Sequence, residues 1–240
     1  MQRSLPFLVV SKIVSWLVIL FGYPLIKILY GYKCHGRENL PRLSLKREKP
    51  PVIFISNHVL PLDPLLQASA LLPRATYFTI LEETLLTPVL GTFIRFLGGI
   101  PIPADPGRIQ AVTEAMGVAL EGRGRVLFYP EGECFLLNQE LQSFKAGAFY
   151  YAMKFHAKII PLVTVIKHSR RGIKAEVHIM KPIEAPRAEG KLSADLHKAI
   201  VLAIETRESI QNLIDAHGGD KTLYQGPMPR IKGINDKNKA

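Results

Sequence analysis

A histidine and a carboxylate lie five residues apart in the stretch SNHVLPLDP, residues 56–64, which follows the apolar run PPVIFI. A neutral imidazole can take a proton from an alcohol, and a carboxylate on its other ring nitrogen fixes the tautomer and stabilises the imidazolium. His58 and Asp63 could therefore form a general base and its orienting partner. The stretch also fits an ordinary helix start, because Asp63 followed by Pro64 is a good N-cap with a first-turn proline. On spacing alone, both interpretations stand.

The alcohol that such a base would activate is expected on a substrate. A serine hydrolase carries its own alcohol on a G-x-S-x-G turn, and this turn occurs nowhere in the sequence. A thiol enzyme with Cys134 as its nucleophile is an alternative. Glu131 and Glu133 stand close to Cys134 in the sequence, and their charges would raise the thiol pKa, which disfavours this alternative.

A second group of polar residues follows the apolar stretch RVLFYP, residues 125–130. In open α/β sheets ligands bind beyond the carboxyl ends of the strands, which is where Glu131 and Gly132 are expected. Gly132 would let a substrate approach the backbone closely, although Pro-Glu-Gly is also common in turns. Lys145 is expected just inside a helix start, where it could meet an anion or point into solvent.

The elements that would position these residues alternate along the chain after residue 50. Short stretches rich in Val, Ile, Phe and Tyr predict strands, and stretches with helical spacing between them predict helices. This alternation is typical of an α/β fold with a largely parallel central sheet flanked by helices. The predicted strands are residues 51–56, 75–80, 98–103, 125–130, 157–166 and 172–180, and the predicted helices are 64–72, 82–97, 107–122, 144–156 and 193–216.

The N-terminal segment is apolar and basic, which predicts a membrane anchor over residues 1–45. Residues 5–32 contain about the twenty apolar positions that a bilayer span requires, if Lys12 is tolerated. A tilted span, a pair of short helices in one leaflet with a break near residues 22–24, and a buried helix of a soluble domain are the alternatives. A signal peptide is disfavoured because the segment contains Trp16 and lacks a small-residue cleavage site.

The basic charge is concentrated at the two ends of the chain. The formal net charge is +11, of which residues 1–50 carry +7 and residues 218–240 carry +3. The part between them is nearly neutral, so no nucleic-acid partner is expected. Basic residues beside an apolar segment instead favour an anionic membrane surface. Residues 218–240 have no hydrophobic period and are predicted to form a flexible basic tail.

Metal ligands are not expected. The two cysteines, Cys34 and Cys134, have neither metal-ligand spacing nor the pattern of a disulfide framework. The remaining histidines occur singly in helical, strand or loop patterns and are expected to be structural or solvated: His35, His156, His168, His178, His197 and His217.

Several blocks stand in a recognisable order behind the apolar segment. They are NHVLPLD at residues 57–63, GIPI at 99–102, PEG at 130–132, FKAG at 144–147 and IIPLVTV at 159–165. This order resembles that of the glycerolipid acyltransferase family, typified by 1-acyl-glycerol-3-phosphate acyltransferases, over roughly residues 50–167. The resemblance implies that His58 is the general base and Asp63 its orienting partner, with Asn57 in the same block.

The resemblance also assigns roles to the later blocks. It implies that Glu131 and Gly132 bind a glycerol-phosphate acceptor, and that Pro161 serves acyl-donor binding or the structure of the site. Two family arginines are missing, because Ala104 and Cys134 stand where the family has them. An arginine–phosphate contact is charge-assisted and bidentate, so its loss costs about 2–5 kcal/mol in a dry site. The basic residues that could replace these arginines are Lys145, Arg95, Arg108 and Arg125.

The resemblance implies an acyltransferase domain over residues 46–217. It would move a fatty acyl group from acyl-CoA or acyl-carrier protein to the hydroxyl of a lyso-lipid, with 1-acyl-glycerol-3-phosphate as the first candidate and no cofactor. Another lyso-lipid or hydroxylated lipid as acceptor, and a catalytically inactive membrane-binding homologue, are the alternatives. The domain is expected on the cytoplasmic face of a membrane. The apolar stretches at residues 75–80 and 87–100 could line an acyl tunnel or pack in the core.

Overall fold

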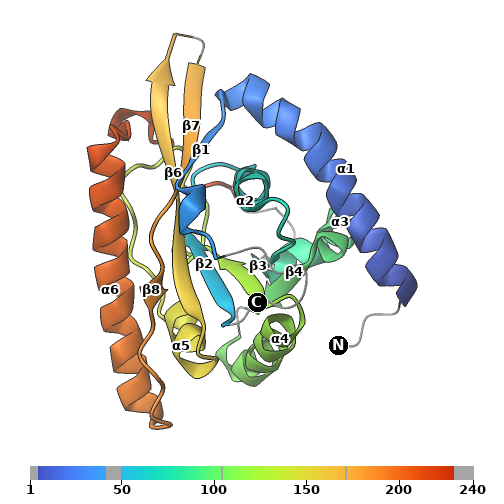
Figure 1. Cartoon of the computed structure of the whole chain (residues 1–240), viewed down its shortest axis with the longest axis vertical. Helices are drawn as coiled ribbons and strands as arrows, with labels where there is room; N and C mark the ends of the chain where they lie inside the picture. Colours follow the sequence, from blue (N-terminus) through green and yellow to red (C-terminus); the bar gives the residue numbers. More distant parts are fainter. Residues whose placement is uncertain (1–4, 42–49, 104, 171, 230–240) are drawn as a thin grey trace, which may run out of the picture.

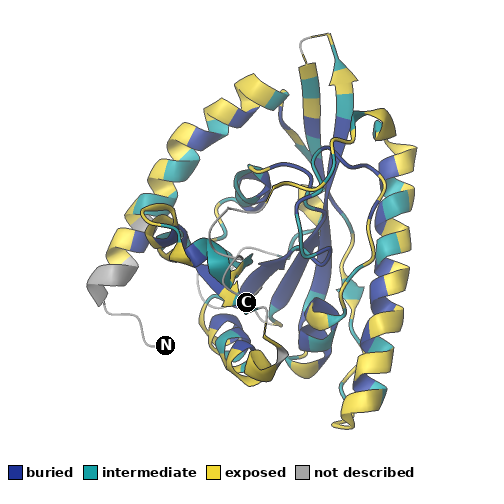
Figure 2. Cartoon of the chain, turned by 180° about the vertical axis from the view of Figure 1, so that it is seen from behind, coloured by how far each residue is buried: buried dark blue, intermediate teal, exposed yellow. Residues whose placement is uncertain are grey.

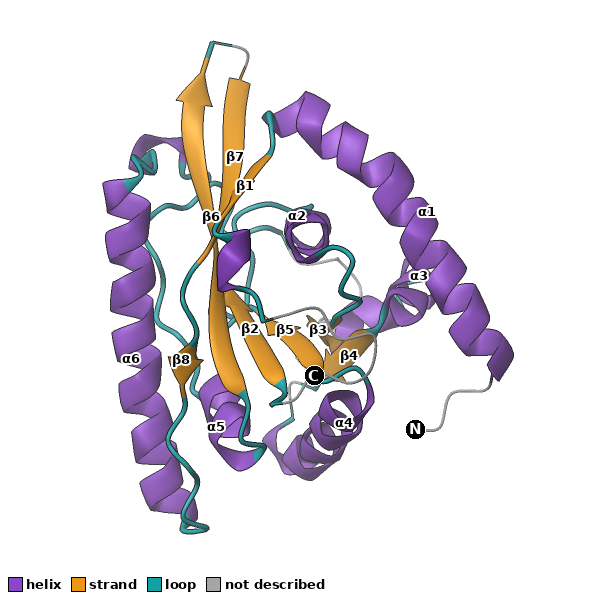
Figure 3. Cartoon of the chain, in the orientation of Figure 1, coloured by secondary structure: helices purple, strands orange, loops and turns teal. Residues whose placement is uncertain are grey.

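The structure is a computed structural model that describes residues 5–41, 50–103, 105–170 and 172–229 (Figure 1). The strands are β1 (Lys33–His35), β2 (Val52–Ser56), β3 (Tyr77–Leu81), β4 (Gly99–Ile102), β5 (Arg125–Phe128), β6 (Lys158–Ser169), β7 (Gly172–Ile179) and β8 (Ile183–Glu184). The helices are α1 (Leu5–Tyr30), α2 (Asp63–Leu71), α3 (Leu90–Leu97), α4 (Ile109–Gly122), α5 (Gly147–Lys154) and α6 (Leu192–Ala216). Strands and helices alternate along the chain from β2 to β6, and β7, β8 and α6 follow (Figure 3).

The strands form one sheet in the order β1-β7-β6-β2-β5-β3-β4, with β8 paired to β6. The strands from β6 to β4 are mutually parallel, whereas β7 and β8 run antiparallel to β6. The prediction of a largely parallel sheet flanked by helices is therefore confirmed. β2 is buried along its whole length, because helices cover both faces of the sheet.

The two faces of β2 belong to two different hydrophobic clusters. Ile53 and Ile55 pack with residues of α4, α5 and α6, whereas Val52 and Phe54 pack with residues of α1 and α2. Successive side chains of a strand point to opposite faces, so this alternation follows directly from the sequence. In Figure 2 the central strands are buried, while the outer surfaces of α1 and α6 are exposed.

The predicted helix over residues 82–97 is interrupted. A 3₁₀ turn covers Glu82–Leu86, and α3 begins only at Leu90. Pro88 lies between them, and a proline has no backbone N–H to continue a helix. The prediction of one helix here is wrong.

α1 is one continuous helix that includes Pro24. The expected break near residues 22–24 is therefore absent, and the pair of short helices is wrong. α1 packs along α2 and α3 through close contacts, because Ser11 donates to the carbonyl of Phe96 and Gly22 lies against Leu65. Most of its other side chains are exposed, so it is not a buried core helix. Residues 9–30 are long and apolar enough to cross a membrane, with a mean hydropathy of 1.9.

Both ends of the predicted domain extend further than expected. Residues 33–35, predicted to belong to the anchor segment, form β1 and pair in parallel with β7. Residues 218–229, predicted to be a flexible tail, pack on the domain. The carbonyl of Ile166 accepts from the backbone N–H of Asp220 over 2.9 Å, and the carbonyl of Cys134 accepts from that of Met228 over 2.7 Å. Residues 218–229 are held by hydrogen bonds between backbone groups, which do not require apolar side chains at regular positions. The sequence of this segment therefore shows no hydrophobic periodicity. Residues 230–240 lie outside the described residues.

Candidate active site

His58 and Asp63 form a hydrogen-bonded pair just after β2. His58 Nδ1 lies 2.9 Å from Oδ2 of Asp63, whose side chain is fully buried. The same oxygen accepts the backbone N–H groups of Val59, over 2.6 Å, and Leu60, over 2.8 Å. Asp63 is the first residue of α2 and not its N-cap, which is Leu62. Its carboxylate therefore organises the preceding turn and the histidine rather than capping the helix.

The imidazole of His58 is oriented on two sides. Its ring stacks on the ring of Tyr129, with 4.2 Å between centroids and 24° between planes. Because Nδ1 faces Asp63, Nε2 is the nitrogen left for a substrate. The side chain of His58 remains 20% exposed and lines a cavity. Such an imidazole can accept a proton from a bound hydroxyl group.

A buried polar network supports Asp63 from behind. Gln67 donates to the hydroxyl oxygens of Ser56 and Thr164 over 2.8 Å each, and Thr164 Oγ1 lies 3.5 Å from Oδ1 of Asp63. Gln67, Thr164 and Tyr129 were not predicted as site residues. Polar side chains within otherwise apolar buried segments were the available signal for Gln67 and Thr164, since buried polar groups need partners.

Asn57 is fully buried and contacts the neighbouring strand. Its Nδ2 donates to the carbonyl of Thr164 over 2.9 Å, and its Oδ1 accepts the backbone N–H of Thr164 over 2.8 Å. Both ends of the amide are thus used to join the end of β2 to β6. The prediction that Asn57 binds substrate is not matched by this geometry, in which it positions the turn that carries His58.

Glu131 also acts on the backbone of this turn. It is 5% exposed, and its two carboxylate oxygens accept the backbone N–H groups of His58 and Gln142, over 3.1 Å each. Burial raises the pKa of Glu131 to about 7, even though these two hydrogen bonds act in the opposite direction. Glu131 does not line the cavity. Where a substrate contact was predicted, the carboxylate is instead occupied by two backbone groups.

Gly132 and Lys145 lie together on the cavity wall next to His58. Gly132 has a φ of +81°, and a Cβ atom there would lie 2.9 Å from Cε of Lys145. The left-handed conformation favours glycine here, and the lysine side chain passes close to the position of the missing Cβ. Lys145 is exposed and precedes α5 by two residues, so its predicted position inside the helix is wrong. Its backbone N–H donates to the carbonyl of Pro130 over 2.9 Å, which holds it in the loop.

Lys145 is the one of the four proposed replacement cations that lines the cavity. Arg108 forms an ion pair with Glu82 over 2.6 Å. Arg125 is buried at the start of β5, at the opposite end of that strand from Gly132, and Arg95 lies on the exposed side of α3. Ala104 lies outside the described residues.

Pro161 lies inside the sheet. It is buried in β6 opposite Ile55, and its carbonyl accepts the backbone N–H of Met180 over 2.9 Å. Pro161 does not line the cavity. Pro161 was expected either to bind the acyl donor or to support the structure of the site. Its buried position in the sheet fits the second role and not the first.

Cys134 lines the cavity but is a poor nucleophile. Burial, together with the negative charges of Asp63 and Glu131, raises the pKa of its thiol to about 12. The thiol is therefore protonated near neutral pH, and the thiol form is weakly nucleophilic. This weighs against the alternative of a thiol enzyme.

The cavity has a volume of about 1160 Å³ and an apolar lining for most of its extent. Its polar and charged lining residues include His58, Glu133 and Lys145, and also Arg74, Glu83, Asp105 and Arg123. Much of the apolar lining comes from α1, α2, β3 and α3: among others Trp16, Ile19, Leu65, Phe78, Ile80, Phe93 and Ile94. The two apolar stretches that could have packed in the core thus supply part of a cavity wall. A mostly apolar cavity whose lining also includes polar and charged side chains suits an amphipathic ligand.

Comparison with known proteins agrees with this arrangement. The family model described as Acyltransferase matches residues 31–165 of the chain. The fold is similar to that of the 1-acyl-sn-glycerophosphate (LPA) acyltransferase PlsC from Thermotoga maritima, with a TM-score of 0.58 and 20% sequence identity over 84% of this chain and 81% of that chain. The matched residues include the His58–Asp63 pair, Glu131-Gly132 and Pro161. The chain belongs to the Acyltransferase family and shares the PlsC-like fold of glycerolipid acyltransferases.

Proposed function

We propose that the protein transfers a fatty acyl group from a thioester donor to the hydroxyl group of a lyso-lipid at a membrane surface. One observation carries the proposal: the buried carboxylate of Asp63 holds Nδ1 of His58, while the other edge of the imidazole is left for a ligand in a long apolar cavity. This is the arrangement that a general base for a lipid hydroxyl requires.

The reaction follows from this geometry. Nε2 of His58 takes the proton of the acceptor hydroxyl, and the oxygen attacks the carbonyl carbon of the thioester. The carbonyl–sulfur bond breaks, and the proton passes from His58 to the leaving thiolate. Asp63 keeps Nδ1 protonated and stabilises the imidazolium that forms between the two proton transfers. Acyl-CoA and acyl-carrier protein both carry the required thioester, and each is a candidate donor.

1-Acyl-glycerol-3-phosphate is the first candidate acceptor, and phosphatidic acid would be the product. Lys145 supports it, because this cation lines the same cavity as His58 and could hold a phosphate there. Glu133 lines this cavity too. A carboxylate there favours, as a second candidate, a lyso-lipid whose headgroup carries a cation beside its phosphate, because the paired charges would match Lys145 and Glu133.

The apolar part of the cavity would hold an acyl chain. Its lining is shared between the domain and α1, so the chain of a lipid could enter along α1 from a membrane. The outer side of α1 exposes large apolar residues such as Trp16, Phe21 and Ile28. We assign residues 1–30, which include α1, to membrane attachment, with the domain on the cytoplasmic face, where anionic lipids attract the basic N-terminal residues.

The test is acyl transfer by purified, detergent-solubilised protein, with His58→Ala beside the wild type. Labelled acyl-CoA and acyl-carrier protein are each offered with a panel of lyso-lipids that includes lysophosphatidic acid. The wild type is expected to acylate at least one acceptor, and His58→Ala is expected to lose at least about 99% of that activity. His197→Ala, on the exposed side of α6, is the matched control and should behave as wild type. Equal activity of wild type and His58→Ala would exclude His58 as the general base. If the wild type acylates no lyso-lipid of the panel, a non-catalytic membrane-binding role would be favoured.

A further inference from the structure

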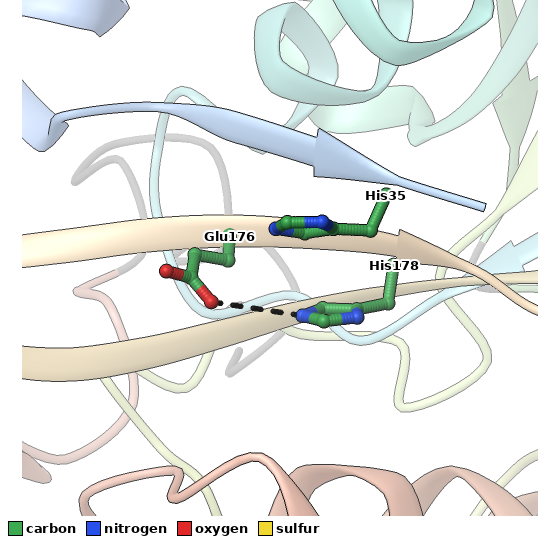
Figure 4. Close-up of side chains that lie close together, drawn as sticks. All are labelled: His35, Glu176 and His178. Carbon is green, nitrogen blue, oxygen red and sulfur yellow. Dashed lines mark ion pairs between the residues drawn. The ribbon is translucent and has the colours of Figure 1, made fainter. Parts of the chain in front are cut away.

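His35 lies beside Glu176 and His178, which are far from it in the sequence, at the β1 edge of the sheet (Figure 4). His35 of β1 is the direct partner of His178 of β7, and Glu176 stands two residues before His178 on the same side of that strand. One ligand atom of each residue lies within 4.8 Å of those of the other two. These histidines were expected to stand singly, and the parallel pairing of β1 with β7 brings them together.

The innermost nitrogen of this group has no hydrogen-bond partner among the described residues. His178 is 8% exposed, and its Nε2 is buried. Nε2 lies on the side of Glu176, 3.8 Å from its Oε2. A buried polar nitrogen without a partner costs free energy, and most buried polar groups are satisfied by protein or by ordered water, so an exception calls for an explanation such as a bound ion.

The remaining neighbours leave the group open on one side. The ring of His35 stacks on that of His178, with 4.7 Å between centroids, and His35 is exposed. His217 lies edge-on against His178 at 4.2 Å, and its Nδ1 faces the carbonyl of Leu213 over 3.0 Å. Lys167 forms an ion pair with Oε2 of Glu176 over 2.6 Å. An incoming cation must therefore bind beside Lys167 or displace it.

We propose that His35, Glu176 and His178 form a binding site for a divalent transition-metal ion of the zinc class. Two imidazoles and one carboxylate are a donor set typical of zinc, and nitrogen donors favour zinc, cobalt, nickel or copper over magnesium and calcium. Ligand atoms around a tetrahedral zinc ion are about 3.3 Å apart. Rotation of the exposed His35 side chain closes the present spacing, while Oε1 of Glu176 can bind the ion with Lys167 still on Oε2. A fourth position stays open to water.

The site lies outside the acyl-transfer machinery. β7 and β6 separate β1 from β2, which carries His58, and none of the three ligands lines the cavity. A bound ion would join β1, a strand of three residues that follows α1, to the longer β7. The expected consequence is stabilisation of the junction between α1 and the sheet by ligand-linked folding, and not a step in the transfer reaction.

The test uses full-length protein in detergent, without a polyhistidine tag, titrated with Zn²⁺ by calorimetry and with Co²⁺ by visible absorption. We expect one ion per chain, with d–d bands of a low-coordinate cobalt site. His35→Ala should weaken binding at least about tenfold, and Lys167→Met should tighten it by removing the competing cation. His197→Ala, on exposed α6, is the matched control.

His35 is exposed, so His35→Ala is expected to fold normally even if the buried His178→Ala variant does not. The proposal is overturned if the wild type binds no ion saturably, or if His35→Ala and Glu176→Gln bind Zn²⁺ and Co²⁺ as tightly as the wild type does. Because binding is measured without lipid substrates, this result is independent of whether the protein transfers acyl groups.

Discussion

The backbone N–H of His58 donates a hydrogen bond to Oε1 of Glu131 over 3.1 Å, across 73 positions of the sequence. β2 and β5 are adjacent parallel strands, so the turns that follow them meet at the same edge of the sheet. The second oxygen of Glu131 accepts the backbone N–H of Gln142. Glu131 therefore fixes the turn that carries the proposed base.

Glu131→Gln is expected to lower kcat by about tenfold, equivalent to about 1.4 kcal/mol of transition-state stabilisation, with little change in the KM of the acceptor. The amide retains an acceptor for His58 but turns an NH₂ group toward the N–H of Gln142. Steady-state kinetics with varied acceptor concentration separates the two parameters. A rise in KM with an unchanged kcat would show instead that Glu131 contacts the acceptor.

Glu131 should also make stability depend on pH. Burial raises its pKa from 4.5 to about 7 in the folded protein. Below pH 4.5 the carboxyl is protonated in both states, whereas between pH 4.5 and 7 the unfolded chain releases the proton that the folded chain keeps. Stability therefore falls as pH rises through this window, by a total of about 3 kcal/mol. The measurement is the difference between wild type and Glu131→Gln in thermal unfolding at pH 5 and pH 8. A difference independent of pH would contradict the assignment.

Asp63→Asn is expected to reduce kcat at least about a hundredfold. An amide oxygen in place of Oδ2 can still accept from His58, Val59 and Leu60, so the turn should keep its shape. The negative charge that stabilises the imidazolium is lost. Thr164→Val, which removes the weaker contact at Oδ1, serves as the comparison and should retain far more activity. If Asp63→Asn and Thr164→Val lower kcat by similar factors, Asp63 would have a role in folding alone.

Lys145→Met is expected to raise the KM for lysophosphatidic acid about tenfold or more, because a charge-assisted hydrogen bond to phosphate is lost. The side chain is exposed and holds no part of the core, so stability should not change. Lys154→Met, at the end of α5, is the matched control for the loss of one positive charge. An unchanged KM in Lys145→Met would rule out Lys145 as the phosphate ligand.

Asn57→Ala is expected to destabilise the protein by about 2 kcal/mol, since two buried backbone groups of Thr164 lose their partners. The free energy of unfolding in urea measures the effect. The KM values of both substrates should stay close to those of the wild type. A variant with wild-type stability and a raised KM would return Asn57 to the role of substrate ligand.

The order of strands and helices was largely predictable, because each element carries its own local pattern. β2 and β5 are short apolar runs that end in polar turns, and this pattern also located His58, Asp63 and Gly132 at one edge of the sheet. The predicted elements were wrong where the local sequence pattern does not reflect how the segment folds or packs. Pro88 interrupts a stretch with helical spacing, and residues 218–229 are held by backbone hydrogen bonds that no side-chain pattern reveals.

The hydrogen-bond partners of the polar side chains in the site were decided only by the tertiary structure. The sequence by itself determined the fold class and the apolar character of α1, since these depend on neighbours within a few residues, whereas its spacing left the pairing of His58 with Asp63 open against an ordinary helix start. It could not show that Asn57 and Glu131 point at backbone groups, or that Lys145 points into the cavity. It also could not bring His35 beside His178. Those relationships depend on which strands become neighbours, and strand order is set by packing of the whole sheet and not by any local stretch.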